Sequence, residues 1–203
     1  MKKLIAMAAI VLGLASAVCA QDVFNKEEPV TWLGLDFSQL KFIKSDEAIG
    51  ESELQDKYFP GWNDLFEIEY KKYDIAKATG RASAAYFTDA VTALNEKAKG
   101  PFIGTQASGF EHLDNAAVTQ VVKRYNLSGK SGIGLVFIVE AMSKPKSAAS
   151  VWVTFIDMGS KKILLAKPVK AKPGGFGFRN YWAGAFYQVL KDMPALMKKW
   201  SKE

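Results

Sequence analysis

A basic, glycine-rich segment near the C-terminus carries the residue types best suited to bind a ligand. Its charged residues and glycines are Lys170, Lys172, Gly174, Gly175, Gly177 and Arg179. A helix is expected to begin directly after the glycines, and the free N–H groups at a helix start bind anions, helped by nearby cations. The segment therefore predicts an edge that contacts an anionic ligand or a partner protein. Tight backbone packing of the glycines is the alternative, because the lysine–serine pair of a Walker loop is absent.

Three carboxylates at or within expected strands form a second candidate site. Asp36 ends the first strand, Glu140 lies inside an apolar strand, and Asp157 ends the strand that follows it. Paired carboxylates perform general acid–base catalysis and glycoside hydrolysis. Acids at strand ends are also frequent turn formers, and Glu140 could pair with a lysine at a sheet edge. A hydrolase of envelope polysaccharide therefore stays open as the alternative to the non-enzymatic binding role that we favour.

The sequence gives little support to a serine hydrolase triad, a zinc site or a dinucleotide-binding loop. His112 is the only histidine, and no Gly-x-Ser-x-Gly elbow accompanies it, so a serine hydrolase triad is not indicated. One histidine also cannot form a multi-histidine zinc site. Gly132 and Gly134 lack the third glycine of a dinucleotide fingerprint, and a strand follows them instead of a helix. We therefore expect no metal and no cofactor.

Residues 1–20 have the pattern of a secretory signal peptide. Two lysines precede an apolar run over residues 4–15, and Val18–Ala20 supplies the short side chains of a cleavage site. The run is shorter than the roughly 20 residues that span a bilayer. We expect cleavage after Ala20 and a periplasmic or secreted protein with no transmembrane segment. The residues before Cys19 match the lipoprotein pattern poorly, so lipid anchoring is not expected.

Composition favours one domain over residues 21–203. The chain is 49% hydrophobic, and Cys19 is its only cysteine; without the leader, the core alone must hold the fold. The net charge of +6 is distributed unevenly, with an acidic stretch over residues 45–69 and a basic one over residues 158–191. Nucleic acid is a poor partner for an exported protein, and the oligomeric state is not set by these patterns.

Hydrophobic periodicity predicts an α+β fold. Strands are expected over 30–37, 132–141, 150–158 and 162–169, and helices over 62–79, 114–125 and 178–200. Residues 82–98 are ambiguous and suit a strand followed by a short helix. The last three strands predict an antiparallel meander, which an N-terminal strand joins in an antiparallel sheet packed against the helices. A long apolar stripe marks the final helix, and Pro194 is expected to kink or divide it.

Two segments together resemble a known family. They are Gly132–Glu140 continuing through Val151–Asp157, and Gly174–Gly184. Both are similar to segments of an uncharacterised family of small exported bacterial proteins, periplasmic or outer-membrane associated. The resemblance implies an exported location and an α+β fold, and it assigns no activity and no catalytic residues.

Overall fold

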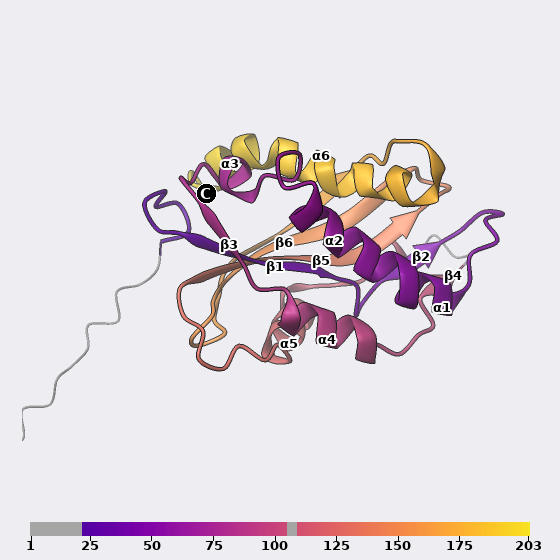
Figure 1. Ribbon diagram of the computed structural model, residues 1–203, viewed down its shortest axis with the longest axis horizontal. Coiled ribbons are helices and arrows are strands. Elements are labelled where there is room, and N and C mark those ends of the chain that lie inside the picture. Colours follow the sequence, from indigo (N-terminus) through magenta and orange to yellow (C-terminus); the bar gives the residue numbers. More distant parts are fainter. Residues whose placement is uncertain (1–21, 105–108) are drawn as a thin grey trace, which may run out of the picture.

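A seven-stranded mixed sheet forms the middle layer of the molecule, with helices on both of its faces (Figure 1). The structure is a computed structural model that describes residues 22–104 and 109–203, so the expected signal peptide lies outside the described residues. The strands are β1 (Val30–Asp36), β2 (Lys41–Ile43), β3 (Ala84–Tyr86), β4 (Ile103–Gly104), β5 (Ile133–Ser143), β6 (Ala148–Asp157) and β7 (Ile163–Ala171). The helical segments are α1 (Glu51–Glu53), the π-helical turn η1 (Leu54–Tyr58), α2 (Phe59–Ile68), α3 (Ile75–Thr79), α4 (Asp89–Lys97), α5 (Asn115–Lys123) and α6 (Gly177–Trp200).

The C-terminal meander is confirmed. β6 pairs antiparallel with β5 on one side and with β7 on the other, and Val153 lies opposite both Phe137 and Lys167. Side chains on both faces of β6 are buried, as expected for a strand covered on both sides. The β6–β7 turn is fixed by Asp157, whose carboxylate accepts a hydrogen bond from the Ser160 N–H at 2.8 Å.

The expected antiparallel placement of the N-terminal strand is wrong, and the fold is α/β. β1 runs parallel to β5, and β2 continues along the same edge of β5, also in parallel. β3 and β4 add outward from β1 and β2, again in parallel. A parallel pair needs a crossover, and α2 to α5 provide it here. Strands of two or three residues, such as β3 and β4, are too short to show a period of two in the sequence.

Each face of the sheet has its own apolar core. α2 and α6 cover one face, where Leu135 and Phe137 of β5 pack with Trp62 and Phe186. α4 and α5 cover the opposite face, where alternate β5 residues such as Val136 meet them. The apolar stripe of α6 is confirmed, and the helix continues unbroken past Pro194, so the expected division does not occur.

The single helix expected over 62–79 is two helices. α2 already begins at Phe59 and ends at Ile68, and α3 begins after Asp74, whose carboxylate accepts a hydrogen bond from the Lys77 N–H at 2.9 Å. This aspartate N-cap starts a new helix within a continuous apolar pattern. α3 ends at Gly80, which has a φ of 71°. Glycine commonly ends helices because it adopts this left-handed conformation without a steric penalty.

Two asparagines occupy the outer edge of β1 beyond the point where β3 ends. Asn63 of α2 accepts a hydrogen bond from the Leu35 N–H and donates one to the Leu35 carbonyl, at 2.7 and 3.1 Å. Asn95 of α4 accepts from the Phe37 N–H at 2.7 Å and also donates to the Leu35 carbonyl at 2.9 Å. Gly34, at a φ of +111°, leaves room for this approach, since a Cβ there would lie 2.7 Å from the Asn63 Oδ1. The two side chains thus replace a neighbouring strand.

Removal of one of these side-chain amides tests whether the asparagines replace a neighbouring strand at the edge of β1. Asn95→Ala leaves the buried Phe37 N–H without its acceptor, so we expect the free energy of unfolding to fall by about 2–3 kcal/mol. Denaturant titration measures the change, with the exposed Asn180→Ala as the control. Equal midpoints for the two variants would show that Asn95 does not hold β1.

Candidate functional site

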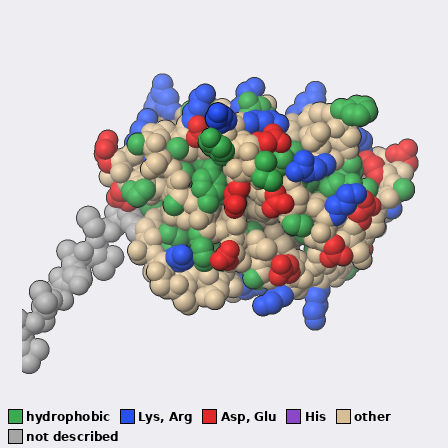
Figure 2. Space-filling model, viewed as in Figure 1, with side chains coloured by type: hydrophobic (Ala, Val, Ile, Leu, Met, Phe, Trp, Pro, Cys, Tyr) green, Lys and Arg blue, Asp and Glu red, His purple; other side chains and the backbone are tan. Residues whose placement is uncertain are grey.

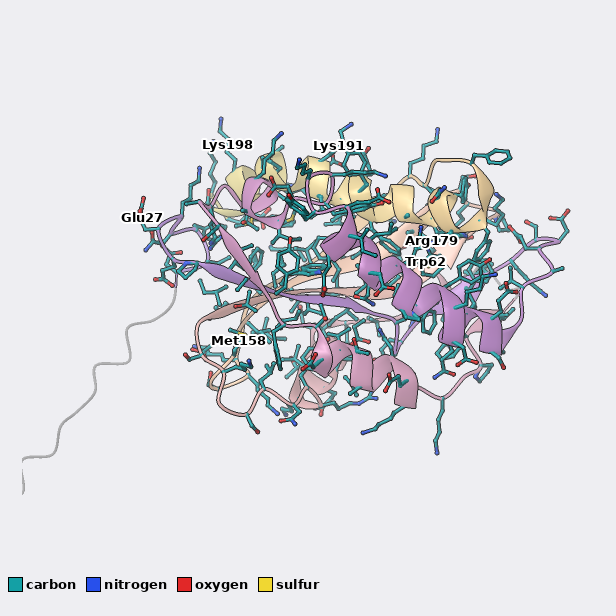
Figure 3. The ribbon with its side chains drawn as sticks, viewed as in Figure 1. Glu27, Trp62, Met158, Arg179, Lys191 and Lys198 are labelled. Atoms are coloured by element: carbon teal, nitrogen blue, oxygen red, sulfur yellow. The ribbon has the colours of Figure 1, made fainter. Side chains whose placement is uncertain are left out.

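The basic segment predicted from the sequence lies where β7 passes into α6, and part of its charge is already engaged. Lys170 forms an exposed ion pair with Glu111 at 2.8 Å. Arg179 donates a hydrogen bond to the Gly61 carbonyl at 3.0 Å, and its own carbonyl accepts one from the Trp62 indole N–H at 2.9 Å (Figure 3). Lys172 is exposed. Arg179 therefore joins α6 to α2, which the sequence did not indicate.

The glycines of this segment serve mainly close backbone packing. The Gly174 N–H donates to the Tyr181 carbonyl at 2.9 Å. A Cβ at Gly184 would overlap the Gly174 carbonyl, and one at Gly175 would lie 2.8 Å from the Asn180 carbonyl oxygen. The loop thus lies directly on the first turns of α6, as the packing alternative states. Gly177 has a φ of +76° and open space around it.

The three carboxylates do not form a common cleft. Glu140 is 2% exposed and sits at a bulge in β5; its carboxylate accepts hydrogen bonds at 2.6 Å from the His112 N–H, the Leu113 N–H and the Ser150 hydroxyl. Asp157 lies opposite Ile133, and the register places it about 17 Å along the sheet from Asp36. Glu140 therefore anchors the 112–113 backbone to the sheet, and Asp157 forms a turn.

Asp36 and Tyr125 form a buried polar pair beneath α5. The Tyr125 hydroxyl donates to the Asp36 carboxylate at 2.7 Å, and that carboxylate also accepts from the Ser38 N–H. Both side chains are fully buried. Burial and the adjacent Asp36 charge raise the pKa of Tyr125 well above its ordinary value. This arrangement stabilises the fold and holds Asp36 away from solvent.

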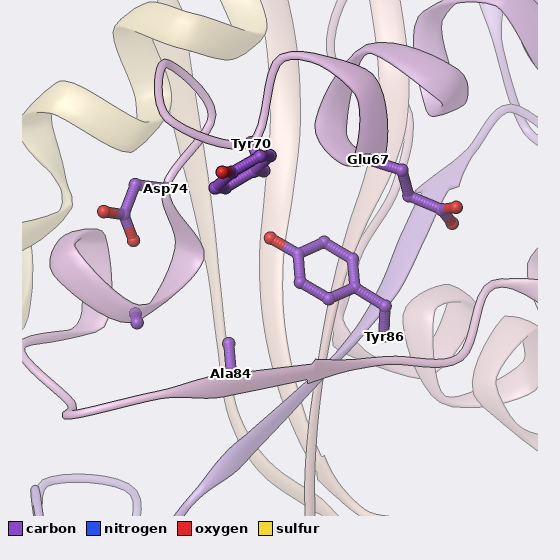
Figure 4. A pocket seen from close by; sticks show the side chains of 6 residues that line it. Glu67, Tyr70, Asp74, Ala84 and Tyr86 are labelled. Atoms are coloured by element: carbon purple, nitrogen blue, oxygen red, sulfur yellow. The ribbon is translucent and has the colours of Figure 1, made fainter.

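A hollow lies elsewhere, between the α2–α3 connection and β3. It measures about 440 Å³, and its lining residues, which we call the tyrosine groove, are Glu67, Tyr70, Asp74, Ala76, Ala84 and Tyr86. In Figure 4 the Tyr70 ring lies above the Tyr86 ring, with Asp74 on one side of the two rings and Glu67 on the other, and the Glu67 carboxylate points away from the rings. Tyr70 is 56% exposed, although it continues the three-to-four spacing of the apolar residues Trp62 and Phe66. α2 has ended before Tyr70, and the ring turns outward.

A second concave region lies between α3 and α6 and is rich in lysine. It consists of two adjoining hollows of about 210 and 290 Å³ that share Ala78 and Pro194. Its cationic residues, which define the lysine groove, are Lys26, Lys71, Lys72, Lys77, Lys191 and Lys198. Cationic side chains gather along the α6 edge of the molecule, and Lys191 and Lys198 project from it (Figures 2 and 3). Sequence reasoning missed this groove because its lysines come from separate segments.

Within residues 22–104 and 109–203, no cluster of three or more His, Cys, Asp or Glu side chains is placed to hold a metal ion. No helix in those ranges has the length and apolar character needed to cross a bilayer.

Comparison with known proteins assigns no activity to this chain. Neither a protein-family model nor a curated protein matches the sequence. Among solved structures, the chain is similar to the hypothetical protein CT253 from Chlamydia trachomatis, with 8% sequence identity and a TM-score of 0.38. That match covers 85% of this chain and 96% of the other. The family resemblance of the sequence therefore remains an expectation.

The buried Asp36–Tyr125 pair predicts a pH dependence of stability. Unfolded Tyr125 loses its proton near pH 10, whereas the folded protein retains it, so stability falls as the pH rises above about 10, by roughly 1.4 kcal/mol per pH unit. Tyr125→Phe has no hydroxyl to titrate and so lacks this alkaline loss of stability. It also removes a hydrogen-bond donor from the buried Asp36 carboxylate, which should lower the free energy of unfolding by about 2–3 kcal/mol at pH 7. Denaturant unfolding between neutral and alkaline pH measures both effects, with the exposed Tyr70→Phe as the control. Parallel alkaline profiles for Tyr125→Phe and the parent protein would contradict this account.

Proposed function

We propose that this protein is an exported, non-enzymatic binding module of the bacterial cell envelope, which holds a phosphate-bearing lipid headgroup in the lysine groove. The observation that carries the proposal is the convergence of lysines from three separate segments on one concave surface between α3 and α6. Clustered lysines attract anionic lipid surfaces with about 1 kcal/mol each.

The electrostatics of the groove favour an anion. Among the residues that the structure describes, Asp74 is the only carboxylate that lines it, and one of its oxygens already caps α3. Lys72 lies 3.3 Å from Glu69 and 5.6 Å from the centre of the Tyr187 ring. Lys191 lies 5.9 Å from that ring. The Tyr187 ring thus lies beside two of the ammonium groups of the groove.

The floor of the groove favours an amphiphile over a free ion. Alongside Lys26 and Lys198, one hollow is lined by apolar side chains: Val23, Phe24, Ala78, Pro194 and Met197. Lysine side chains above an apolar floor match a phosphate headgroup joined to an acyl or glycerol portion. Free inorganic phosphate would use only the upper part of this surface.

The hydrolase alternative gains no specific support. Asp36 and Glu140 are buried and accept hydrogen bonds from fixed backbone and hydroxyl donors. A glycosidase needs two carboxylates that face a common substrate cleft. We therefore favour binding over catalysis.

Charge reversal at the lysine groove tests the proposal. Lys77→Glu with Lys191→Glu removes two attractive charges and adds two repulsive ones, so binding to phosphatidylcholine vesicles that contain phosphatidylglycerol should weaken by at least about 30-fold. Vesicle co-sedimentation measures the affinity, and excess inorganic phosphate should compete poorly.

The matched control is Lys170→Glu with Lys172→Glu, which changes the net charge equally at the edge predicted from the sequence. We expect this pair to weaken binding by less than about threefold, as a distant exposed charge does. If both double variants lost the same vesicle affinity, the change in net charge alone would explain the result and the lysine groove would not be the site. A larger loss of affinity in the Lys170→Glu, Lys172→Glu protein would place the binding site at that edge instead.

Export is tested by the mature N-terminus. In a bacterial host we expect the protein in the periplasm or medium, with a mass that begins at Gln21, because the segment before it matches a cleaved leader. Ala20→Tyr places a bulky residue at the cleavage position and should leave the leader attached. Cytosolic protein that retains Met1 would contradict the expected location.

A further inference from the structure

β3 offers a free edge beside the tyrosine groove. Within the described ranges, β3 pairs with β1 on one side and with no strand on the other. β3 crosses in front of β1 in Figure 1. In the close view of Figure 4, the two tyrosine rings of the groove lie above β3. Anything that extends along β3 would therefore pass the mouth of the groove.

The backbone of β3 has outward-facing hydrogen-bonding groups at two positions. The Phe87 N–H donates to the Trp32 carbonyl of β1 at 2.9 Å. Successive residues of a strand point their backbone groups to opposite sides. The N–H and C=O of Ala84 and Tyr86 therefore point away from β1. Such groups pair readily with an added extended chain.

The groove beside this edge is suited to a cation. Within the described part of the chain, its lining contains two carboxylates, two tyrosine rings and no cationic side chain. Burial raises the pKa of Tyr86, and the negative charges of Asp74 and Glu67 raise it further. Aromatic faces together with carboxylates attract ammonium and guanidinium groups. The nearest lysine on the lining helix, Lys77, contributes to the lysine groove on the other side of Asp74.

We propose that β3 binds an extended segment of a partner protein as an added strand, and that this segment places a lysine or arginine side chain between Tyr70 and Tyr86, with Glu67 and Asp74 on either side. The free strand edge supplies the backbone hydrogen bonds, and the groove selects the side chain. Among the described residues, Asp74 is the one lining residue that the tyrosine groove and the lysine groove share, so the protein would connect an anionic surface with a basic partner.

Synthetic peptides test the two halves of the proposal separately. The parent probe is a nine-residue peptide of alternating threonine and valine with one central arginine. A second peptide carries citrulline there, which has the shape of arginine without its charge. A third is N-methylated at alternate residues and cannot pair with a strand edge. Titration into ¹⁵N-labelled protein, followed by NMR, gives the affinities and the amide shifts of Ala84 and Tyr86.

We expect the citrulline peptide to bind about tenfold more weakly than the arginine peptide, because it loses the cation–π and carboxylate contacts. The N-methylated peptide should not protect the Ala84 and Tyr86 amides from exchange. Equal affinity for arginine and citrulline would overturn the cation site. Binding of free argininamide as tight as that of the whole peptide would overturn strand addition, and so would tighter binding of a neutral hexasaccharide.

Protein variants complete the test. Glu67→Gln with Asp74→Asn removes both charges, and asparagine still caps α3, so binding of the arginine peptide should fall about tenfold while that of the citrulline peptide stays unchanged. Ala84→Pro removes one outward N–H and should weaken the binding of both peptides.

The Lys77→Glu, Lys191→Glu protein should bind the arginine peptide at least as well as the parent protein does, which separates this result from the test of the lysine groove. If neutralising Glu67 and Asp74 leaves arginine binding intact, the proposal fails.

Discussion

The arrangement of the molecule depends on how the outer edge of β1 is satisfied. Over its first residues β1 pairs with β3, but from Leu35 onward its backbone groups bond to the side chains of Asn63 and Asn95. A buried strand edge without partners would cost free energy at every unpaired group. Because α2 and α4 supply the two amides, these bonds also fix a helix on each face of the sheet.

The same constraint shapes the tyrosine groove. β3 ends at Tyr86 because the next part of the β1 edge is already taken by the asparagines. α2 is held close to β1 by Asn63, so the connection that follows it passes over β3 with Tyr70 outside the core. The tyrosine groove thus forms because β3 ends at Tyr86 while Asn63 holds α2 close to β1. The lysine groove, by contrast, depends on the packing of α3 against α6.

The sequence predicted those parts of the fold whose signals are local. The meander follows from three apolar strands joined by short turns, and α6 follows from a stripe of residues repeated along one helix. α5 begins near the expected start of a helix over 114–125, where the Asp114 side chain accepts a hydrogen bond from the Ala117 N–H. The parallel direction of β1 could not be predicted, because it depends on a crossover of nearly a hundred residues that includes very short strands. Asp74 restarted a helix where the apolar pattern continued.

The candidate sites were less predictable for a similar reason. The sequence located Lys170, Lys172 and Arg179 as neighbours, yet the structure pairs Lys170 with Glu111 and turns Arg179 toward α2. The lysine groove collects residues from positions 26 to 198, and no sequence window contains them together. Glu67 and Asp74 belong in or beside the acidic stretch seen in the sequence, but their relation to Tyr86 needs the sheet. Chemistry that depends on long-range contacts therefore stays hidden until the topology is known.

Native-state hydrogen exchange tests the role of the β1 edge most directly. If Asn63 and Asn95 act as a substitute strand, the amide protons of Leu35 and Phe37 should exchange as slowly as that of Phe137 in the centre of β5. Rapid exchange at Leu35 and Phe37, similar to that of the outward-facing Tyr86 amide, would contradict this account. It would show that the edge of β1 opens freely and that the two asparagines do not fix the helices beside it.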